Sequence, residues 1–255
     1  MKIKPLILLL TKLGLGRGIF RKYMIKSLKK ECNGLIDFER FGIRFRLNIH
    51  SNTTDSKILT SSKIYDKQEL FFLKECINDG TFIDIGANTG YYTLFLTKYT
   101  SCNVIAIEPN PQTLELLKTN IKINDLDDRV YVVSKGISSS ESTTLYSSGS
   151  LGTASMHQIN NLSKSIQIKT DSLLNIINEK KIKKIDAIKI DIEGMEDQAL
   201  IPFFNEAPKE LFPKCIVLEH NHNELWKEDL FKVLKKNNYK FIYQNKSNSM
   251  LKLLF

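Results

Sequence analysis

Several common features are missing from this 255-residue chain, and each absence excludes a class of protein. The four cysteines form no CxxC pair and no cluster with histidine, so the sequence gives no zinc site. We expect Cys32, Cys76, Cys102 and Cys215 to be reduced thiols, with Cys102 and Cys215 buried as small core residues. The apolar run Leu6–Leu10 is much shorter than the roughly 20 residues of a spanning helix, and no cleavage pattern follows it. We therefore expect a cytoplasmic protein.

Acidic residues are absent from positions 1–30, which hold nine lysines and arginines. The rest of the chain is formally neutral, so the net charge of +9 belongs to this N-terminal arm. Nucleic-acid enzymes usually carry positive charge around the active site, and we therefore expect no nucleic-acid partner. The oligomeric state is not encoded in any pattern that we recognise.

The basic arm has two interpretations. Phe20, Tyr23, Met24 and Leu28 share one face at helical spacing, and basic residues occupy the rest of the helix. Such a helix can dock on the anionic inner surface of a membrane. Alternatively, it packs on the domain and exposes its basic face to solvent.

A regular alternation of short apolar strands and helices begins at Thr81. Continuous apolar runs between helices are typical of buried parallel strands, and right-handed crossovers then give a doubly wound sheet. The fold class is therefore α/β, with a mostly parallel seven-stranded Rossmann-like sheet and an antiparallel C-terminal hairpin. The expected strands are Thr81–Ile85, Val104–Ile107, Val130–Val133, Ile166–Lys169, Asp186–Ile190, Cys215–Leu218, Tyr239–Tyr243 and Met250–Phe255. The expected helices are Tyr91–Lys98, Pro111–Ile123, Ser172–Glu179, Glu196–Phe204 and Lys227–Lys236.

Two further segments precede and interrupt this pattern. Residues 35–38 and 43–49 predict a hairpin, and residues 66–78 predict a helix, so we divide the chain into an arm with a hairpin at 1–60 and a domain at 61–255. Residues 138–165 are rich in Ser, Thr, Gly and Asn. This insertion is either a lid or binding loop, or a plain surface hairpin.

The turn after the first domain strand carries the features of a nucleotide site. Asp84 ends the strand, Gly86 and Gly90 follow it, and Glu108 stands at the end of the next strand, where a carboxylate can bind both ribose hydroxyls. The glycine pattern GxGxxG that favours a pyrophosphate is absent, and the charge of Asp84 would repel one. A carboxylate there can instead help to hold a cationic ammonium group, directly or through water. These features favour S-adenosylmethionine over NAD.

The motifs also resemble a known family. Asp84–Tyr91, Glu108-Pro109-Asn110 with Asn120, Lys189–Glu196 and Glu219-His220 together resemble the FkbM-type methyltransferases, over roughly residues 66–243. The resemblance implies a methyltransferase fold and O-methylation of a hydroxyl, commonly on a sugar of a glycan, glycolipid or natural product. The expected donor-binding residues are Asp84, Gly86, Ala87, Asn88, Gly90, Tyr91, Glu108 and Pro109.

A hydroxyl acceptor requires a base beside the methyl group, at the carboxyl ends of the middle strands. Asp191 can act as that base or orient the acceptor, and His220 has the best intrinsic pKa for a base at neutral pH. Glu219 can orient His220 or bind the donor. Each also has a structural interpretation, since Asp191 can cap the following helix and His220 can be an ordinary loop histidine.

Other functions remain open at this stage. A nicotinamide-dependent oxidoreductase uses the same type of sheet, and a non-catalytic protein can keep the donor site. The spacing of Asp191, Glu193 and Glu219 does not establish a divalent metal site, and we expect none. The sequence does not identify the acceptor; we expect the region before the domain and the Ser-rich insertion to select it.

Overall fold

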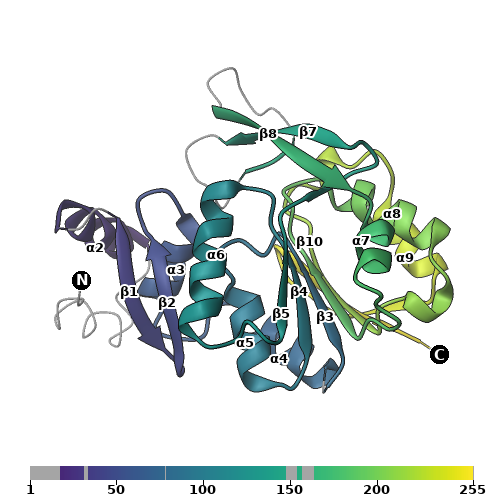
Figure 1. Cartoon of the computed structure of the whole chain (residues 1–255), viewed down its shortest axis with the longest axis horizontal. Coiled ribbons are helices and arrows are strands. Elements are labelled where there is room, and N and C mark those ends of the chain that lie inside the picture. The colour runs from purple at the N-terminus through teal and green to yellow at the C-terminus, as the bar shows by residue number, and fades with distance from the viewer. Residues whose placement is uncertain (1–17, 32–33, 78, 148–153, 157–163, 255) are drawn as a thin grey trace.

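The centre of the molecule is a seven-stranded sheet (Figure 1). A computed structural model describes residues 18–31, 34–77, 79–147, 154–156 and 164–254. The sheet has the order β11-β12-β10-β9-β3-β4-β5, and β12 runs antiparallel to β10 and β11. The predicted sheet and its antiparallel C-terminal hairpin are confirmed. Its strands are β3 (Thr81–Ile85), β4 (Asn103–Ile107), β5 (Val130–Val133), β9 (Ala187–Ile190), β10 (Cys215–Glu219), β11 (Tyr239–Gln244) and β12 (Asn248–Leu253).

The order of these strands determines where a ligand can bind. From β3 the chain moves outward through β4 and β5 on one side, and it returns to β9 on the other side of β3. The connections therefore diverge at the carboxyl ends of β3 and β9. In doubly wound sheets such a switch point is where ligands bind.

Helices cover both faces of the sheet, and successive strand residues supply the two cores. Phe82 belongs to the core under α4, α5 and α6, whereas its neighbour Ile83 belongs to the core under α7, α8 and α9. This alternation is why the strands read as continuous apolar runs. The helices are α4 (Lys67–Cys76), α5 (Tyr91–Tyr99), α6 (Pro111–Ile123), α7 (Leu173–Glu179), α8 (Glu196–Glu206) and α9 (Leu230–Lys236).

Of the N-terminal segments, β2 (Ile43–Asn48) packs against α6 (Figure 1). These segments comprise α2 (Gly18–Glu31), the antiparallel hairpin of β1 (Leu35–Arg40) and β2, and α3 (Thr53–Thr60), a helix that sequence analysis missed. The buried Asn120 of α6 accepts from the backbone N–H of Arg46 at 2.6 Å and donates to its carbonyl at 3.2 Å. One hydrophobic core also includes residues from both sides of position 60. The division at that position stays a prediction.

In the described part of the basic arm, the predicted apolar face is only partly buried. Met24 and Leu28 of α2 are buried in the core, whereas Tyr23 is exposed. This is the packing that the second interpretation of the arm requires. Residues 1–17 lie outside the described ranges, and contact with a membrane stays a prediction. Within the described part of the chain, no helix has the length and apolar character needed to cross a bilayer.

The Ser-rich insertion contributes to a separate sheet. β8 (Lys164–Asp171) pairs with β6 (Gly136–Ile137) and with β7 (Ser142–Ser147), in the order β6-β8-β7. The expected strand Ile166–Lys169 is therefore not part of the main sheet, because its outward residues are polar and suit a strand with one solvated face. The insertion forms a hairpin, although residues 148–153 and 157–163 lie outside the described ranges.

The prediction of reduced thiols is wrong for one pair. Cys76, at the end of α4, forms a disulfide with Cys215, at the start of β10. The two positions are 139 residues apart, so no local pattern indicated the pairing. Cys102 is a buried free thiol, as predicted. Cys32 lies outside the described residues.

Candidate active site

The turn between β3 and α5 brings the backbone close to the switch point. Gly86 and Gly90 have φ values of +73° and +97°, which favour glycine. A Cβ atom on Gly86 would lie 2.0 Å from the carbonyl oxygen of Asp191, so a side chain would displace the loop that follows β9. Ala87 and Asn88 line a cavity at this turn, whereas Gly90 caps α5 and does not line it.

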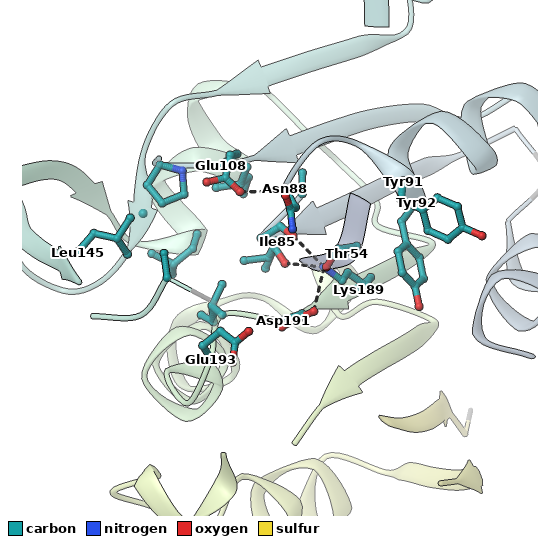
Figure 2. Close-up of a pocket in the computed structure, with 18 of the residues that line it drawn as sticks. Thr54, Ile85, Asn88, Tyr91, Tyr92, Glu108, Leu145, Lys189, Asp191 and Glu193 are labelled. Atoms are coloured by element: carbon teal, nitrogen blue, oxygen red, sulfur yellow. Dashed lines mark hydrogen bonds and ion pairs between the residues drawn. The ribbon is translucent and has the colours of Figure 1, made fainter. Parts of the chain in front are cut away.

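Glu108 presents a fixed carboxylate to the same cavity (Figure 2). Its two oxygens each accept a backbone N–H at 2.9 Å, one from Asn88 and the other from Asn110. Burial raises the pKa of Glu108 to about 7, although these two N–H groups and Lys189 oppose the shift. Each oxygen retains a lone pair for a further donor, which is what binding of ribose hydroxyls requires.

Helix α3 and its cap residue Asn52, which precede the predicted domain at 61–255, support the turn between β3 and α5. The Asn52 side chain donates to Asn88 Oδ1 at 2.6 Å, and Thr89 Oγ1 donates to Asp55 at 2.6 Å. Asp55 also accepts the backbone N–H of Asn48, yet its burial raises its pKa to about 7. The turn between β3 and α5, called the donor turn below, is therefore held in place partly by residues that precede position 61.

Asp84 occupies a different position from the one predicted. It is fully buried, and its Oδ2 accepts the backbone N–H and the hydroxyl of Thr93 in α5. Its Oδ1 lies 3.6 Å from Lys189 Nζ. The cavity lining does not include Asp84, whose buried carboxylate lies between Thr93 and Lys189. In this position Asp84 does not contact a donor ammonium group directly. Its hydrogen bonds to Thr93 hold α5, and its charge is paired with that of Lys189.

The chemistry of the first cavity suits S-adenosylmethionine. Apolar side chains can enclose a purine ring, Glu108 can accept from ribose hydroxyls, and Asp66 can face a positively charged methionine portion. Tyr91 and Pro109, both predicted for donor binding, line this cavity too. Its apolar lining comprises Ile85, Ile107, Ile137, Leu145, Ala154, Met156 and Ile192, with Leu145, Ala154 and Met156 coming from the insertion.

A second cavity adjoins the first and is much more polar. Asp191 and Glu193 line both cavities, as do Lys189, Tyr92 and Asp66, so the two cavities meet at the end of β9. The polar residues found only in the second cavity come from α3, α4, β10 and the hairpin of β11 and β12. They are Thr53, Lys57, Glu69, Glu219, Asn221, Asn245, Lys246, Ser247 and Asn248.

Two of the three predicted catalytic residues lie in this second cavity. Asp191 is half-exposed at the junction, with Oδ2 3.9 Å from Lys189 Nζ (Figure 2). Glu219 accepts the backbone N–H of Asn221 at 2.9 Å through Oε1, whereas Oε2 is buried without a hydrogen-bond donor among the described residues. Burial, followed by the nearby charge of Asp191, raises the pKa of Glu219 to about 8.

His220 lies outside both cavities. Its side chain is buried, and its ring centroid is 5.7 Å from that of Phe231 in α9. Successive residues at the end of β10 point to opposite faces, so Glu219 and His220 cannot both face the second cavity. The geometry does not support His220 as the base. Nε2 of His222, its close neighbour, lies 3.1 Å from a carboxylate oxygen of Glu193.

Sequence reasoning missed three charged residues of this site. Lys189 is the one charged residue within the apolar run of β9, a signal that was available. Asp66 has a positive φ of 47° before α4 and accepts from the Tyr92 hydroxyl at 3.1 Å. Glu69 accepts from Asn245 at 2.7 Å, although 176 positions separate them, so no local pattern could have joined the two.

Within the described ranges, no group of three or more His, Cys, Asp or Glu side chains is arranged to hold a metal ion. The expectation of no metal stays a prediction, as does the individual role of each predicted residue.

Comparisons with known proteins identify the family of this chain. The model of the methyltransferase FkbM domain matches residues 84–242. The hexuronic acid methyltransferase AglP of Haloferax volcanii is 28% identical over 128 residues, which cover 50% of this chain and 52% of that protein. The ribosomal protein L11 methyltransferase of Thermotoga maritima is 26% identical over 87 residues, covering 34% of this chain and 28% of that protein. The matches thus span about half or less of these relatives.

Solved structures were also found to be similar. A methyltransferase FkbM from Methylobacillus flagellatus KT has 21% identity and a TM-score of 0.47, covering 70% of this chain and 44% of that one. An O-methyltransferase from Bacillus cereus in complex with SAH has 13% identity and a TM-score of 0.47, covering 75% and 83%.

The family match extends over more than half of the chain and includes Asp84, Glu108, Asp191 and Glu219. It confirms the predicted methyl donor and removes the nicotinamide alternative. The chain belongs to the FkbM family of S-adenosylmethionine-dependent methyltransferases.

Proposed function

We propose that this chain transfers the methyl group to a hydroxyl of a sugar, in a glycan, a glycolipid or a natural product. The observation that carries the proposal is the second, polar cavity, which shares Asp191 with the donor cavity. An acceptor in the second cavity and a donor in the first would meet at this carboxylate.

The lining of the second cavity supports a polyol acceptor. Carboxylate and amide oxygens and amide N–H groups surround it, and these are the groups that bind the many hydroxyls of a sugar. Glu69 already binds the side-chain amides of Asn245 and Asn248 at 2.7 and 3.0 Å, which fixes the rim formed by the terminal hairpin. The likeness to a hexuronic acid methyltransferase also favours a sugar.

The donor-binding residues and the base have separate tasks. Glu108 and the Gly86 turn would hold the donor, and the bound donor supplies an electrophilic methyl carbon on a sulfonium centre. Asp191 would accept the proton of the acceptor hydroxyl, since this half-exposed carboxylate lines both cavities. Glu219, which also lines the second cavity, would form a hydrogen bond with an acceptor hydroxyl through Oε2, which has no partner among the described residues.

The test uses the full chain, S-adenosylmethionine labelled on the methyl group, and glycan and lipid extracts of the source organism. We expect label in a sugar fraction that resists mild alkali, because an O-methyl ether is stable where a methyl ester is hydrolysed. A matched reaction with Glu108→Ala should give little label. Label released by alkali, or found only in protein or nucleic acid, would contradict the proposal.

A further inference from the structure

Lys189 carries an ammonium group where charged side chains are rarely found. It lies in β9, the second strand of the switch point, and is only 6% exposed. Burial of a lysine costs several kcal/mol unless its charge is compensated. Although burial lowers its pKa, nearby carboxylates outweigh this effect and raise the pKa of Lys189 overall, so the group remains a cation. These carboxylates are Asp191, Asp84, Glu108 and Asp66.

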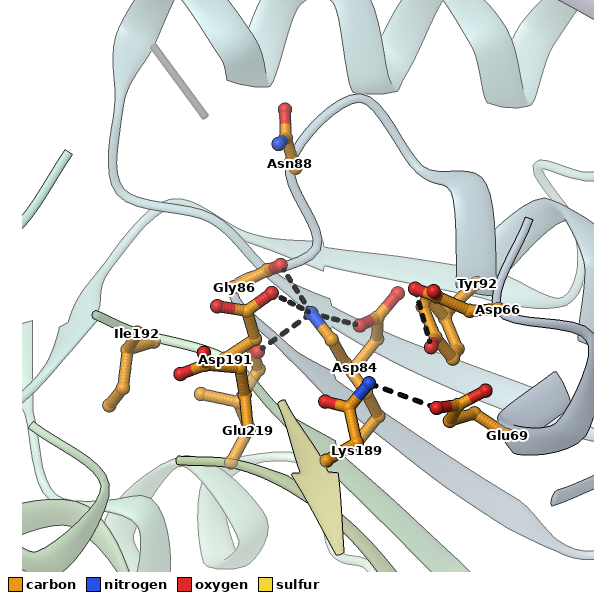
Figure 3. Close-up of polar contacts among 12 residues, drawn as sticks. Asp66, Glu69, Asp84, Gly86, Asn88, Tyr92, Lys189, Asp191, Ile192 and Glu219 are labelled. Carbon is orange, nitrogen blue, oxygen red and sulfur yellow. Dashed lines mark hydrogen bonds and ion pairs between the residues drawn. The ribbon is translucent and has the colours of Figure 1, made fainter. Parts of the chain in front are cut away.

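Oxygens of four residues surround this ammonium group (Figure 3). Nζ donates to the carbonyl oxygen of Gly86 at 2.8 Å. The other oxygens placed around it are more distant, at 3.5 Å for the Ile85 carbonyl, 3.6 Å for Asp84 and 3.9 Å for Asp191. A lysine has three N–H donors, and one of these contacts has the length of a normal hydrogen bond. The longer contacts are the ones that a ligand oxygen could replace.

The position of Lys189 indicates which ligand would use it. The residue lines both the donor cavity and the second cavity, so it lies at the floor of their junction. The carboxylate of the donor is a poor partner, because Asp84 and Asp191 already surround the ammonium group with negative charge. An acceptor hydroxyl is neutral when it enters, and it becomes negative only as its proton passes to Asp191 and neutralises that carboxylate.

We propose that Lys189 is a catalytic residue that binds the acceptor oxygen and stabilises its developing negative charge. This inference rests on the proposed function. The hydroxyl proton passes to the Asp191 carboxylate, the freed electron pair of the oxygen forms the bond to the methyl carbon, and the electron pair of the broken C–S bond stays on sulfur. Lys189 donates hydrogen bonds throughout and gives up no proton.

The test must separate this role from a purely structural one. Lys189→Met alone would leave Asp84 buried without a cation, so the principal variant combines Lys189→Met with Asp84→Asn, which keeps an oxygen for the donors of Thr93. The matched control combines Lys214→Met with Asp186→Asn. It removes a lysine–aspartate pair from the amino end of the same sheet. A second variant combines Lys189→Gln with Asp84→Asn. It keeps a hydrogen-bond donor at position 189 but removes the positive charge.

Two measurements are made on each protein: the affinity for S-adenosylhomocysteine by calorimetry, and the single-turnover rate against pH with the acceptor found by labelling. We expect both Lys189 variants to bind S-adenosylhomocysteine within about threefold of wild type. Their methyl-transfer rate should fall about 100-fold, the usual effect of losing an oxyanion-stabilising donor. The half-maximal rate should move to higher pH by about one unit, because the cation no longer favours the deprotonated oxygen.

Other results overturn the inference. Rates within threefold of wild type and an unchanged pH profile would make Lys189 structural. A loss of more than tenfold in S-adenosylhomocysteine affinity would assign it to the donor. If neither variant folds while the control does, Lys189 is required for the fold and the catalytic assignment is withdrawn. Failure of the proposed function is seen separately, since wild type would then methylate no sugar hydroxyl.

Discussion

The donor cavity and the second cavity differ in how completely their polar groups are paired. At the donor cavity, both oxygens of Glu108 hold backbone N–H groups and the turn is tied to α3. At the second cavity, Glu219 Oε2 has no donor among the described residues, and Lys189 has one hydrogen bond of normal length. The donor cavity is therefore preorganised, whereas polar groups of the second cavity still lack full hydrogen bonding. Under the proposed assignment of the two cavities, donor binding is prepared in the fold, whereas the acceptor completes its own site.

The strongest test of this comparison is Asp191→Asn. Asparagine keeps the size of the side chain but cannot accept the hydroxyl proton, so turnover should fall about 1000-fold. Affinity for S-adenosylhomocysteine should stay within about threefold, as measured by calorimetry. Asp125→Asn, at an exposed position with positive φ that asparagine tolerates, is the control. A parallel loss of donor affinity would show that the two cavities are not functionally separate.

Glu108→Ala tests the preorganised side. The substitution removes a carboxylate that would bind ribose hydroxyls and also leaves the N–H groups of Asn88 and Asn110 without this partner. Hydrogen bonds to charged groups contribute about 1.5–3 kcal/mol each, so the Kd for S-adenosylmethionine should rise at least about 100-fold. The exposed Glu115→Ala should leave the Kd unchanged. An unaltered Kd in Glu108→Ala would show that the donor lies elsewhere.

The variant Asn120→Ala tests whether the turn at the donor cavity depends on the N-terminal hairpin. The Asn120 amide donates to the carbonyl of Thr89 at 2.8 Å and also bonds the backbone of Arg46, so its loss leaves buried groups unpaired. We expect the free energy of unfolding, from urea denaturation, to fall by about 2 kcal/mol. The exposed pair of Arg44 and Asp125 is the comparison, and Arg44→Ala should cost less than about 0.5 kcal/mol. Equal losses would argue against this connection.

The smallest expected effect is the pH dependence of donor affinity. The pKa of Glu108 is raised to about 7 without a ligand, and ribose hydroxyls and a cationic donor favour its ionised form. Binding therefore releases a proton below pH 7, and affinity is full above that value and falls as pH decreases through it. S-adenosylmethionine should bind about tenfold more weakly at pH 6 than at pH 8. In Glu108→Gln this change should largely disappear; its persistence would assign it to another group.

The comparison also explains how much the sequence could predict. The donor side is a local strand–turn–helix, and its glycines, Glu108 and the helix Pro111–Ile123 were all readable within short windows. The second cavity joins α3, α4, β10 and the terminal hairpin, which only tertiary packing brings together. Asp191 and Glu219 were found because they end strands. Glu69 and Asn245 were missed because nothing near either residue indicates the other.

The errors have physical causes as well. The alternation of side chains along a strand was applied to the core but not to the polar residues at strand ends. Applied to the end of β10, it would have separated Glu219 from His220. The helix α3 was overlooked, although Asn52 caps it through the backbone N–H groups of Thr54 and Asp55.

Helix α3 has a consequence for how this enzyme can change over evolution. Thr53, Thr54 and Lys57 line the second cavity, while Asn52 and Asp55 of the same segment hold the donor turn. A segment exchanged to alter acceptor preference would thereby disturb donor affinity too. New acceptors are therefore more readily reached through substitutions on the terminal hairpin, which borders the second cavity without contributing to the lining of the first.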